Sequence, residues 1–93
     1  MLKFEWDARK AAANLHKHGI DFEEATSAFY DDQARVIDDP LHSVSEERFL
    51  LLGMTARLRL VVVSHCLRRQ GEVIRVISAR KASAGEAKHY PSR

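Results

Sequence analysis

Three apolar runs in the second half of the chain constrain its fold more than any other feature. They cover residues 48–55, 59–67 and 72–80, are rich in Val, Ile and Leu, and have the length of strands. The connecting segments "ARL" and "RRQG" are short enough for hairpins. Because consecutive strands joined by hairpins pair antiparallel, the sequence predicts a meander in this half of the chain.

A strand and a helix are predicted at the N-terminus. Residues 2–6 alternate apolar and charged side chains, which is typical of a strand with one buried face. Asp7 is suited to cap the Ala-rich helix predicted over residues 8–18, and Gly19 is suited to end it.

A second helix follows at once. Asp21 with Glu24 is an acidic variant of the capping box, and one face of this helix is apolar, formed by Phe22, Ala25, Ala28 and Phe29. A brief strand is predicted at residues 34–38, and Ser83 with Glu86 forms a capping box for a last helix. The predicted class is α+β, with a small antiparallel sheet, an N-terminal helical hairpin and a short C-terminal helix in the order β-α-α-β-β-β-β-α.

The size of the chain predicts one domain over residues 1–93, because a chain this short builds one core. The lone Cys66 forms no internal disulfide, and the start "MLKFEWD" lacks the apolar centre of a signal peptide. No apolar run approaches the roughly 20 residues that span a bilayer. These features predict a cytoplasmic protein without a membrane segment.

Charge is distributed unevenly along the chain. Residues 1–47 hold 11 acidic and 5 basic residues, a net charge of −6, whereas residues 48–93 hold 2 acidic and 10 basic residues, a net charge of +8. Such asymmetry predicts a basic face, whose usual partners are nucleic-acid phosphates or an acidic protein segment. The alternative is that these cations only keep the edges of a small sheet soluble.

Several kinds of site are excluded or disfavoured. The sequence has no Gly-rich phosphate loop, no CxxC pair and no GxSxG elbow. His16 and His18 lie two residues apart on the predicted helix and project in different directions, so a zinc site is not predicted there. His42 stands in a polar stretch, where a solvated side chain is the ordinary interpretation. No metal and no cofactor are therefore expected.

The stretch "VIRVISARKAS" at residues 73–83 places cations in and beside a strand. Simple alternation sends Arg75 and Arg80 to opposite faces of the sheet. Arg75 would bind either an anion or a carboxylate of this chain, with Glu46 and Glu47 as the candidates. Arg80 and Lys81 lie near the start of the last helix, where an anion is favoured, and otherwise they form an exposed basic loop.

His65 and Tyr90 are the remaining candidates for chemistry. His65 follows the apolar stretch "LVVV", so it is either a buried histidine satisfied by the backbone or a proton carrier near Arg75 or Arg80. Tyr90 could donate a proton or stack on a base, and its alternative is to pack on the sheet.

Two motifs give the chain a resemblance to a known family. The pattern WDxxKxxxNxxKHG occupies residues 6–19, and the pattern ISARxAxxxE occupies residues 77–86. Together with "DDPLHSVSEERFLLLG" and "LVVVSH", they extend the likeness over nearly the whole chain. In these features the chain resembles the BrnT toxins of type II toxin–antitoxin systems.

The resemblance implies a fold similar to the RelE-like ribonuclease toxins and an activity that cleaves RNA and inhibits translation. It also implies a neutralising antitoxin of the BrnA type, a ribbon-helix-helix protein through which the complex contacts DNA. By this likeness the catalytic residues are Arg75, Arg80 and Tyr90. Lys17, which belongs to the first motif, is taken as a substrate-binding residue.

The chemistry of the candidates is compatible with that activity. RNA cleavage without a metal uses the 2′-hydroxyl as nucleophile, so the protein must stabilise a charged phosphorane and move two protons. The cations predicted to hold the phosphate are Arg75, Arg80 and Lys81. His65 is the predicted general base or acid, and Glu47 and Arg48 would orient these groups.

A second function remains open from the sequence. The basic face could instead belong to a binding module without catalytic power, which docks RNA or an acidic protein partner. Replacing Arg80 or His65 by Ala distinguishes the two, since an enzyme would lose cleavage and keep its antitoxin, whereas a binding module would have no cleavage to lose.

Overall fold

A computed structural model describes residues 1–38 and 48–91 of the chain. The predicted α+β class and element order are confirmed, with a short 3₁₀ helix added after the second helix. The elements are β1 (Phe4–Glu5), α1 (Ala8–His18), α2 (Phe22–Ser27), the 3₁₀ helix η1 (Ala28–Tyr30), β2 (Arg35–Asp38), β3 (Phe49–Met54), β4 (Leu60–Arg68), β5 (Val73–Lys81) and α3 (Ala84–Ala87).

The strands form one five-stranded sheet in the order β1-β5-β4-β3-β2. The pairs from β2 to β5 are antiparallel, as the short connections predict, so the meander is confirmed. β1 lies parallel to β5 and pairs only with Ile74 and Arg75. β1 is therefore shorter than predicted, and among residues 1–38 and 48–91 no other strand pairs with the rest of this edge of β5.

The caps of α1 confirm the sequence prediction. The Asp7 carboxylate accepts hydrogen bonds from the backbone N–H groups of Arg9 and Lys10 at 2.8 and 3.1 Å. Gly19 ends the helix with a φ of +72°, a left-handed conformation that glycine adopts without strain, and its N–H donates to the carbonyl of Leu15.

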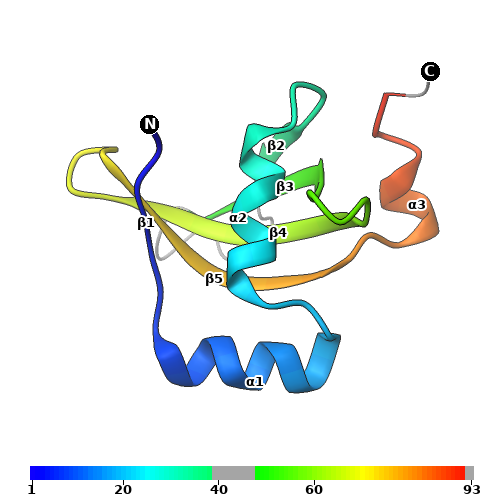
Figure 1. Ribbon diagram of the computed structural model, residues 1–93. Coiled ribbons are helices and arrows are strands. Elements are labelled where there is room, and N and C mark those ends of the chain that lie inside the picture. The colour runs from blue at the N-terminus through cyan, green and yellow to red at the C-terminus, as the bar shows by residue number, and fades with distance from the viewer. Residues whose placement is uncertain (39–47, 92–93) are drawn as a thin grey trace.

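The core lies between the helices and one face of the sheet. Figure 1 shows α2 crossing that face while α1 lies beside β5. The fully buried large side chains are Phe22, Ile20, Val61, Val63 and Val76. Trp6 packs edge-on against Phe22 with ring centroids 5.9 Å apart, which fixes the entry of the chain into α1.

An irregularity in β5 corrects the predicted direction of the two arginines. Ser64 pairs with Ser78, but the next residue of β4 pairs with Val76, so Ile77 is an extra residue in the ladder. As a result Val76 and Ala79 both point into the core, although they are three residues apart. Arg75 and Arg80 therefore leave the sheet on the same face, not on opposite faces.

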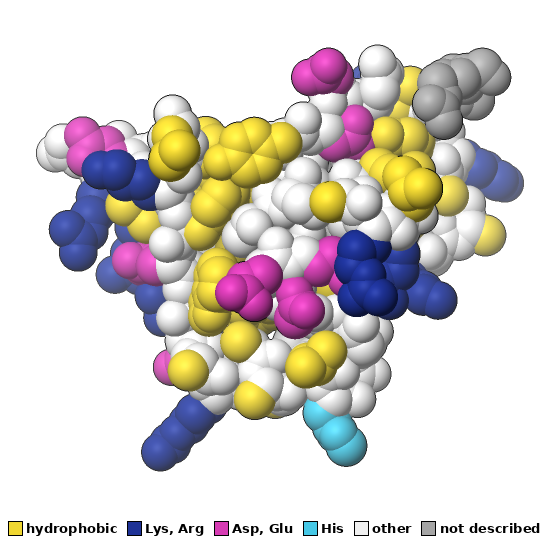
Figure 2. Space-filling model, viewed as in Figure 1, with side chains coloured by type: hydrophobic (Ala, Val, Ile, Leu, Met, Phe, Trp, Pro, Cys, Tyr) yellow, Lys and Arg dark blue, Asp and Glu magenta, His cyan; other side chains and the backbone are white. Residues whose placement is uncertain are grey.

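Acidic and basic side chains gather over different elements of the surface. In Figure 2, which views the side covered by α2, acidic side chains gather over that helix and basic side chains lie beside them. Many of the basic residues of the second half belong instead to β4, β5 and the turn between them. Within the described residues, no helix has the length and apolar character needed to cross a bilayer.

Candidate functional site

The sheet has a second face, opposite α2, which we call the outer face. It is formed by the residues that alternate with the core positions, namely Leu50, Leu52, Val62, Ser64, Arg75, Ser78 and Arg80. The two serines are cross-strand partners that lie between the two arginines. The outer face thus combines two guanidinium groups and two hydroxyls on an apolar floor.

Arg80 is held by α3 through a two-point contact. Its Nη1 and Nη2 donate to the two carboxylate oxygens of Glu86 at 2.7 and 2.9 Å. The predicted capping box is confirmed, since Glu86 also accepts from the N–H of Ser83 while the Ser83 hydroxyl accepts from the N–H of Glu86. The Arg80 guanidinium lowers the pKa of Glu86 to about 2, so the pair is ionised at neutral pH.

Arg75 has a different carboxylate partner from the two considered in the sequence. Its Nη1 donates to Oε2 of Glu5 at 2.8 Å, across the parallel pairing of β1 with β5. Both side chains are about one-third exposed, so solvent screens this pair and an incoming phosphate can compete for the guanidinium. Glu46 and Glu47 lie outside the described residues.

A groove of about 300 Å³ lies on the outer face beside the Arg80–Glu86 pair. Its floor is apolar, and polar groups reach it from both sides, so that it is lined by Arg35, Ile37, Leu50, Leu52, Val62, Glu86 and His89. α3 therefore contributes to the opposite side of the sheet from α1 and α2.

Arg35 and His89 were not singled out from the sequence. The spacing of His89 three residues after Glu86 was the available signal, because residues three apart lie on one face of a helical turn. This spacing alone does not predict that His89 lies near a groove, because the sequence does not show that this helical turn folds back over the sheet.

His65 lies on the other face of the sheet, away from both arginines. The residue is only 4% exposed, and its ring packs edge-on against Phe29, with centroids 4.9 Å apart, and beside Phe49 at 5.8 Å. Nδ1 lies 3.2 Å from the carbonyl oxygen of Val63, and burial lowers the pKa of the imidazole. The structure does not bring His65 together with Arg75 or Arg80, although His65 pairs with the neighbour of Arg75.

Tyr90 is tied to the end of η1. Its hydroxyl donates to Oδ2 of Asp31 at 2.6 Å, and the same oxygen accepts the N–H of Met54 at 2.8 Å. This contact attaches the segment after α3 to the end of β3, and Tyr90 is not among the residues that line the groove.

The predicted substrate-binding residues are dispersed. Lys81 is exposed at the end of β5, and its carbonyl oxygen lies 3.4 Å from Nη1 of Arg80. Arg48 is partly buried just before β3. Lys17 is exposed on α1, which lies beside β5. Glu47 lies outside the described residues, as does His42, for which a solvated side chain was expected.

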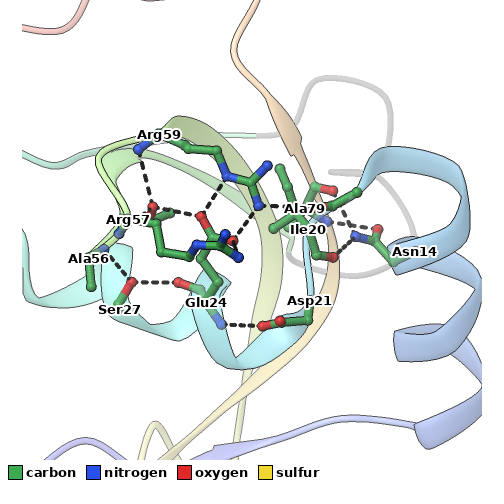
Figure 3. A network of polar contacts seen from close by, with 11 residues as sticks. Asn14, Ile20, Asp21, Glu24, Ser27, Ala56, Arg57, Arg59 and Ala79 are labelled. Atoms are coloured by element: carbon green, nitrogen blue, oxygen red, sulfur yellow. Dashed lines mark hydrogen bonds and ion pairs between the residues drawn. The ribbon is translucent and has the colours of Figure 1, made fainter.

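A buried polar network next to the core was missed by the sequence reasoning. Glu24 does not complete the predicted capping box with Asp21, because its carboxylate turns to the guanidinium of Arg59 and to the Thr55 hydroxyl (Figure 3). Arg59 also donates to the carbonyl of Gly19 at 2.9 Å. The hydrogen bond from Arg59 is the largest cause that lowers the pKa of Glu24, and the bond from Thr55 adds to it. Together these bonds attach the β3–β4 turn to α2 and to the end of α1.

Among the described residues, no group of three His, Cys, Asp or Glu side chains is placed to hold a metal ion. The outer face and the groove beside it bring together guanidinium, hydroxyl, carboxylate and imidazole groups. This set suits the binding and polarisation of a phosphodiester.

Comparison with known proteins points in the same direction. The model of a family described as the ribonuclease toxin, BrnT, of type II toxin–antitoxin systems matches residues 6–86. The fold is similar to the crystal structure, at 1.1 Å resolution, of the ribonuclease toxin BrnT of Brucella abortus, with a TM-score of 0.68 and 27% sequence identity. The match covers 89% of this chain and 99% of the Brucella chain. No match was found among curated proteins.

Proposed function

This chain belongs to the BrnT family of ribonuclease toxins of type II toxin–antitoxin systems, and we propose that it cleaves RNA on the outer face of its sheet without a metal ion. The observation that carries this proposal is the extra residue in β5, which puts Arg75 and Arg80 on one face. Five residues of strand separate them by roughly 15 Å, so they would contact different phosphates of one RNA strand.

Arg80 is the residue that holds the scissile phosphate in this proposal. A guanidinium that already presents two parallel N–H groups to a carboxylate can present the same pair to a phosphate. As RNA binds, the phosphate takes the place of Glu86 and the negative charge on the phosphorane gains two charge-assisted hydrogen bonds. The apolar floor of the neighbouring groove accommodates an unstacked base.

The reaction is the attack of the 2′-hydroxyl on the adjacent phosphorus, which forms a 2′,3′-cyclic phosphate and releases the 5′-oxygen. One proton leaves the 2′-hydroxyl and one is delivered to the 5′-oxygen. Before RNA binds, the Arg80 guanidinium lowers the pKa of Glu86 to about 2, so Glu86 is a carboxylate that the phosphate displaces. His89 lines the groove beside it, and an imidazole is the side chain best suited to exchange protons at neutral pH.

The biological outcome proposed is inhibition of translation, relieved by the antitoxin that a type II system supplies. The resemblance noted in the sequence supports an antitoxin of the BrnA type with a ribbon-helix-helix domain, and a cytoplasmic site of action. DNA would be contacted only through that partner.

The test is incubation of the purified chain with end-labelled RNA in EDTA. We expect cleavage by the wild type, a loss of at least about 100-fold in Arg80→Ala, and products that end in a 2′,3′-cyclic phosphate. Arg57→Ala is the matched control, because it removes one cation whose single described ion pair is 3.9 Å long. Each variant is first checked for a cooperative thermal transition.

The outcomes separate the proposed functions. Cleavage that needs an added metal would overturn the proposed reaction, and equal loss in both variants would overturn the assignment to Arg80. If purified RNA stays intact in every lane, the same variants are tested on translating ribosomes. Intact messenger RNA there as well would leave the non-catalytic binding module as the function.

A further inference from the structure

A second groove, of about 210 Å³, lies on the edge of the sheet between α1 and β5. It is lined by Lys10, Ala13, Asn14, Lys17, His18, Ile77 and Ser78. We call it the edge groove. It exists because β1 ends after pairing with Arg75, so that α1 and not another strand lies beside the rest of β5.

The edge groove has a fixed geometry. Asn14 of α1 bonds to both backbone groups of Ala79 in β5, so the helix is attached to the strand at the middle of the groove. The backbone N–H and C=O of Ala79 are thereby paired with a side chain of α1. A groove built in this way offers side chains, not an open strand edge, to a ligand.

The side chains that it offers are cationic. Lys10 and Lys17 are exposed. Within the described part of the chain, no carboxylate lines the groove and no ion pair occupies either ammonium group. This distinguishes them from Arg75 and Arg80, which are each paired with a glutamate. Uncompensated lysines beside polar groups are suited to an anion.

The spacing favours a chain of anions over a single one. Lys10 and Lys17 are two helical turns apart, about 10.5 Å along the axis, so their ammonium groups reach separate phosphates. Ser78 lines the groove and, by its register, belongs to the outer face between Arg75 and Arg80. A strand bound over the arginines would therefore pass the edge of β5 at Ser78 and reach α1.

We propose that the edge groove binds the phosphates of the RNA strand that flanks the cleaved bond, with Lys10 and Lys17 as the principal contacts and His18 beside them. This inference rests on the proposed function and extends it to a substrate-binding site outside the groove that holds the reacting phosphate. It also gives Lys17 a defined place in substrate binding, which its distance from the outer face alone would not suggest.

The experiment measures binding of a fluorescent 12-nucleotide RNA in which every 2′-hydroxyl is methylated, so that cleavage cannot occur. Dissociation constants are measured between about 50 and 300 mM salt, because each contact with a single-stranded phosphate contributes about 0.7 to the slope of log K against log salt. The test variant is Lys10→Gln/Lys17→Gln. The matched control is Lys3→Gln/Arg9→Gln, which removes the same charge from exposed residues that do not line the groove.

We expect the salt slope of the test variant to fall by about 1.4 and that of the control to stay within about 0.3 of the wild type. Lys10→Arg/Lys17→Arg should restore the slope. An unchanged slope in the test variant, an equal fall in the control, or no RNA binding by the wild type would each overturn the proposal. So would weaker binding of the antitoxin in the test variant with RNA binding intact, since the groove would then belong to the protein partner.

This readout is independent of the reaction. Loss of the salt slope with no cleavage of unmodified RNA would support the edge groove and overturn the proposed ribonuclease site. If cleavage depends on Arg80 but Lys10→Gln/Lys17→Gln keeps the salt slope of the wild type, the ribonuclease site is supported and the edge groove is overturned.

Discussion

The side-chain amide of Asn14 pairs with the backbone of Ala79 as a neighbouring strand would. Oδ1 accepts the N–H of Ala79 at 3.0 Å, and Nδ2 donates to its carbonyl at 2.8 Å and to that of Ile20 at 2.9 Å (Figure 3). Asn14 is only 7% exposed, so water cannot readily replace these bonds. One side chain thus attaches α1, the turn after it and the open edge of β5.

Replacing Asn14 by Ala should lower the free energy of unfolding by about 3 kcal/mol, because it leaves buried backbone donors and acceptors unpaired. Urea denaturation at pH 7 measures this. His16→Ala on the exposed side of α1 is the control and should change the stability by less than about 0.5 kcal/mol. A loss below about 1 kcal/mol in Asn14→Ala would show that another group satisfies Ala79.

Local signals in the sequence predicted the elements well. Asp7 and Gly19 mark the ends of α1 because capping depends on residues within one turn. Short connectors likewise predicted the antiparallel pairing of β3, β4 and β5. The parallel pairing of β1 with the opposite end of the chain has no local signal, and its length was predicted too long.

The sequence pointed to Arg75 and Arg80 as residues of the candidate site, but it did not predict which face they share or which partners they bind. The single extra residue at Ile77 reverses the face of one arginine relative to the other, and no pattern in "VIRVISARKAS" reveals it. The partners of Arg75 and Glu24 are likewise set by tertiary contacts 70 and 35 residues away along the chain. The sequence around His65 predicts that it lies in a strand, but it does not predict whether the side chain is buried or on which face of the sheet it lies.

Gly53 in β3 is a position where any side chain must displace backbone. A Cβ atom there would lie 2.9 Å from the carbonyl oxygen of Ala28 in η1. We therefore expect Gly53→Ala to destabilise the fold by about 2 kcal/mol in thermal or urea denaturation. At Gly85 in α3 the nearest atom is 4.0 Å away, so Gly85→Ala should be neutral or stabilise by about 0.5 kcal/mol. Equal effects at the two sites would contradict this close packing of η1 on β3.

The Arg80–Glu86 pair should make stability depend on pH in acid. The pKa of Glu86 is lowered from 4.5 to about 2, so the pair stabilises the fold fully above pH 4.5 and loses its contribution as the pH falls toward 2. Glu86→Gln should lower stability at pH 7 by about 1 kcal/mol, a figure reduced for solvent screening, and should weaken the decline between pH 4.5 and 2.

The measurement for Glu86 is urea denaturation at pH 7, 4.5 and 3. Glu72→Gln, which removes an exposed carboxylate from the turn before β5, is the matched control and should keep the acid dependence of the wild type. An acid profile of Glu86→Gln that overlays the wild type would mean that the pair contributes nothing to folding.

His65 should make stability depend on pH near neutrality while having no part in cleavage. Burial against Phe29 and Phe49 lowers its pKa below 6.5, so the unfolded chain takes up a proton that the folded chain resists. Stability is then full above pH 6.5 and falls below it by up to about 1.4 kcal/mol per pH unit. His65→Phe should abolish this decline between pH 7 and 5.5 and still cleave RNA, whereas His16→Gln should change neither property. Loss of cleavage in a folded His65→Phe variant would instead place the imidazole in the reaction, and would require His65 to leave its pocket when RNA binds.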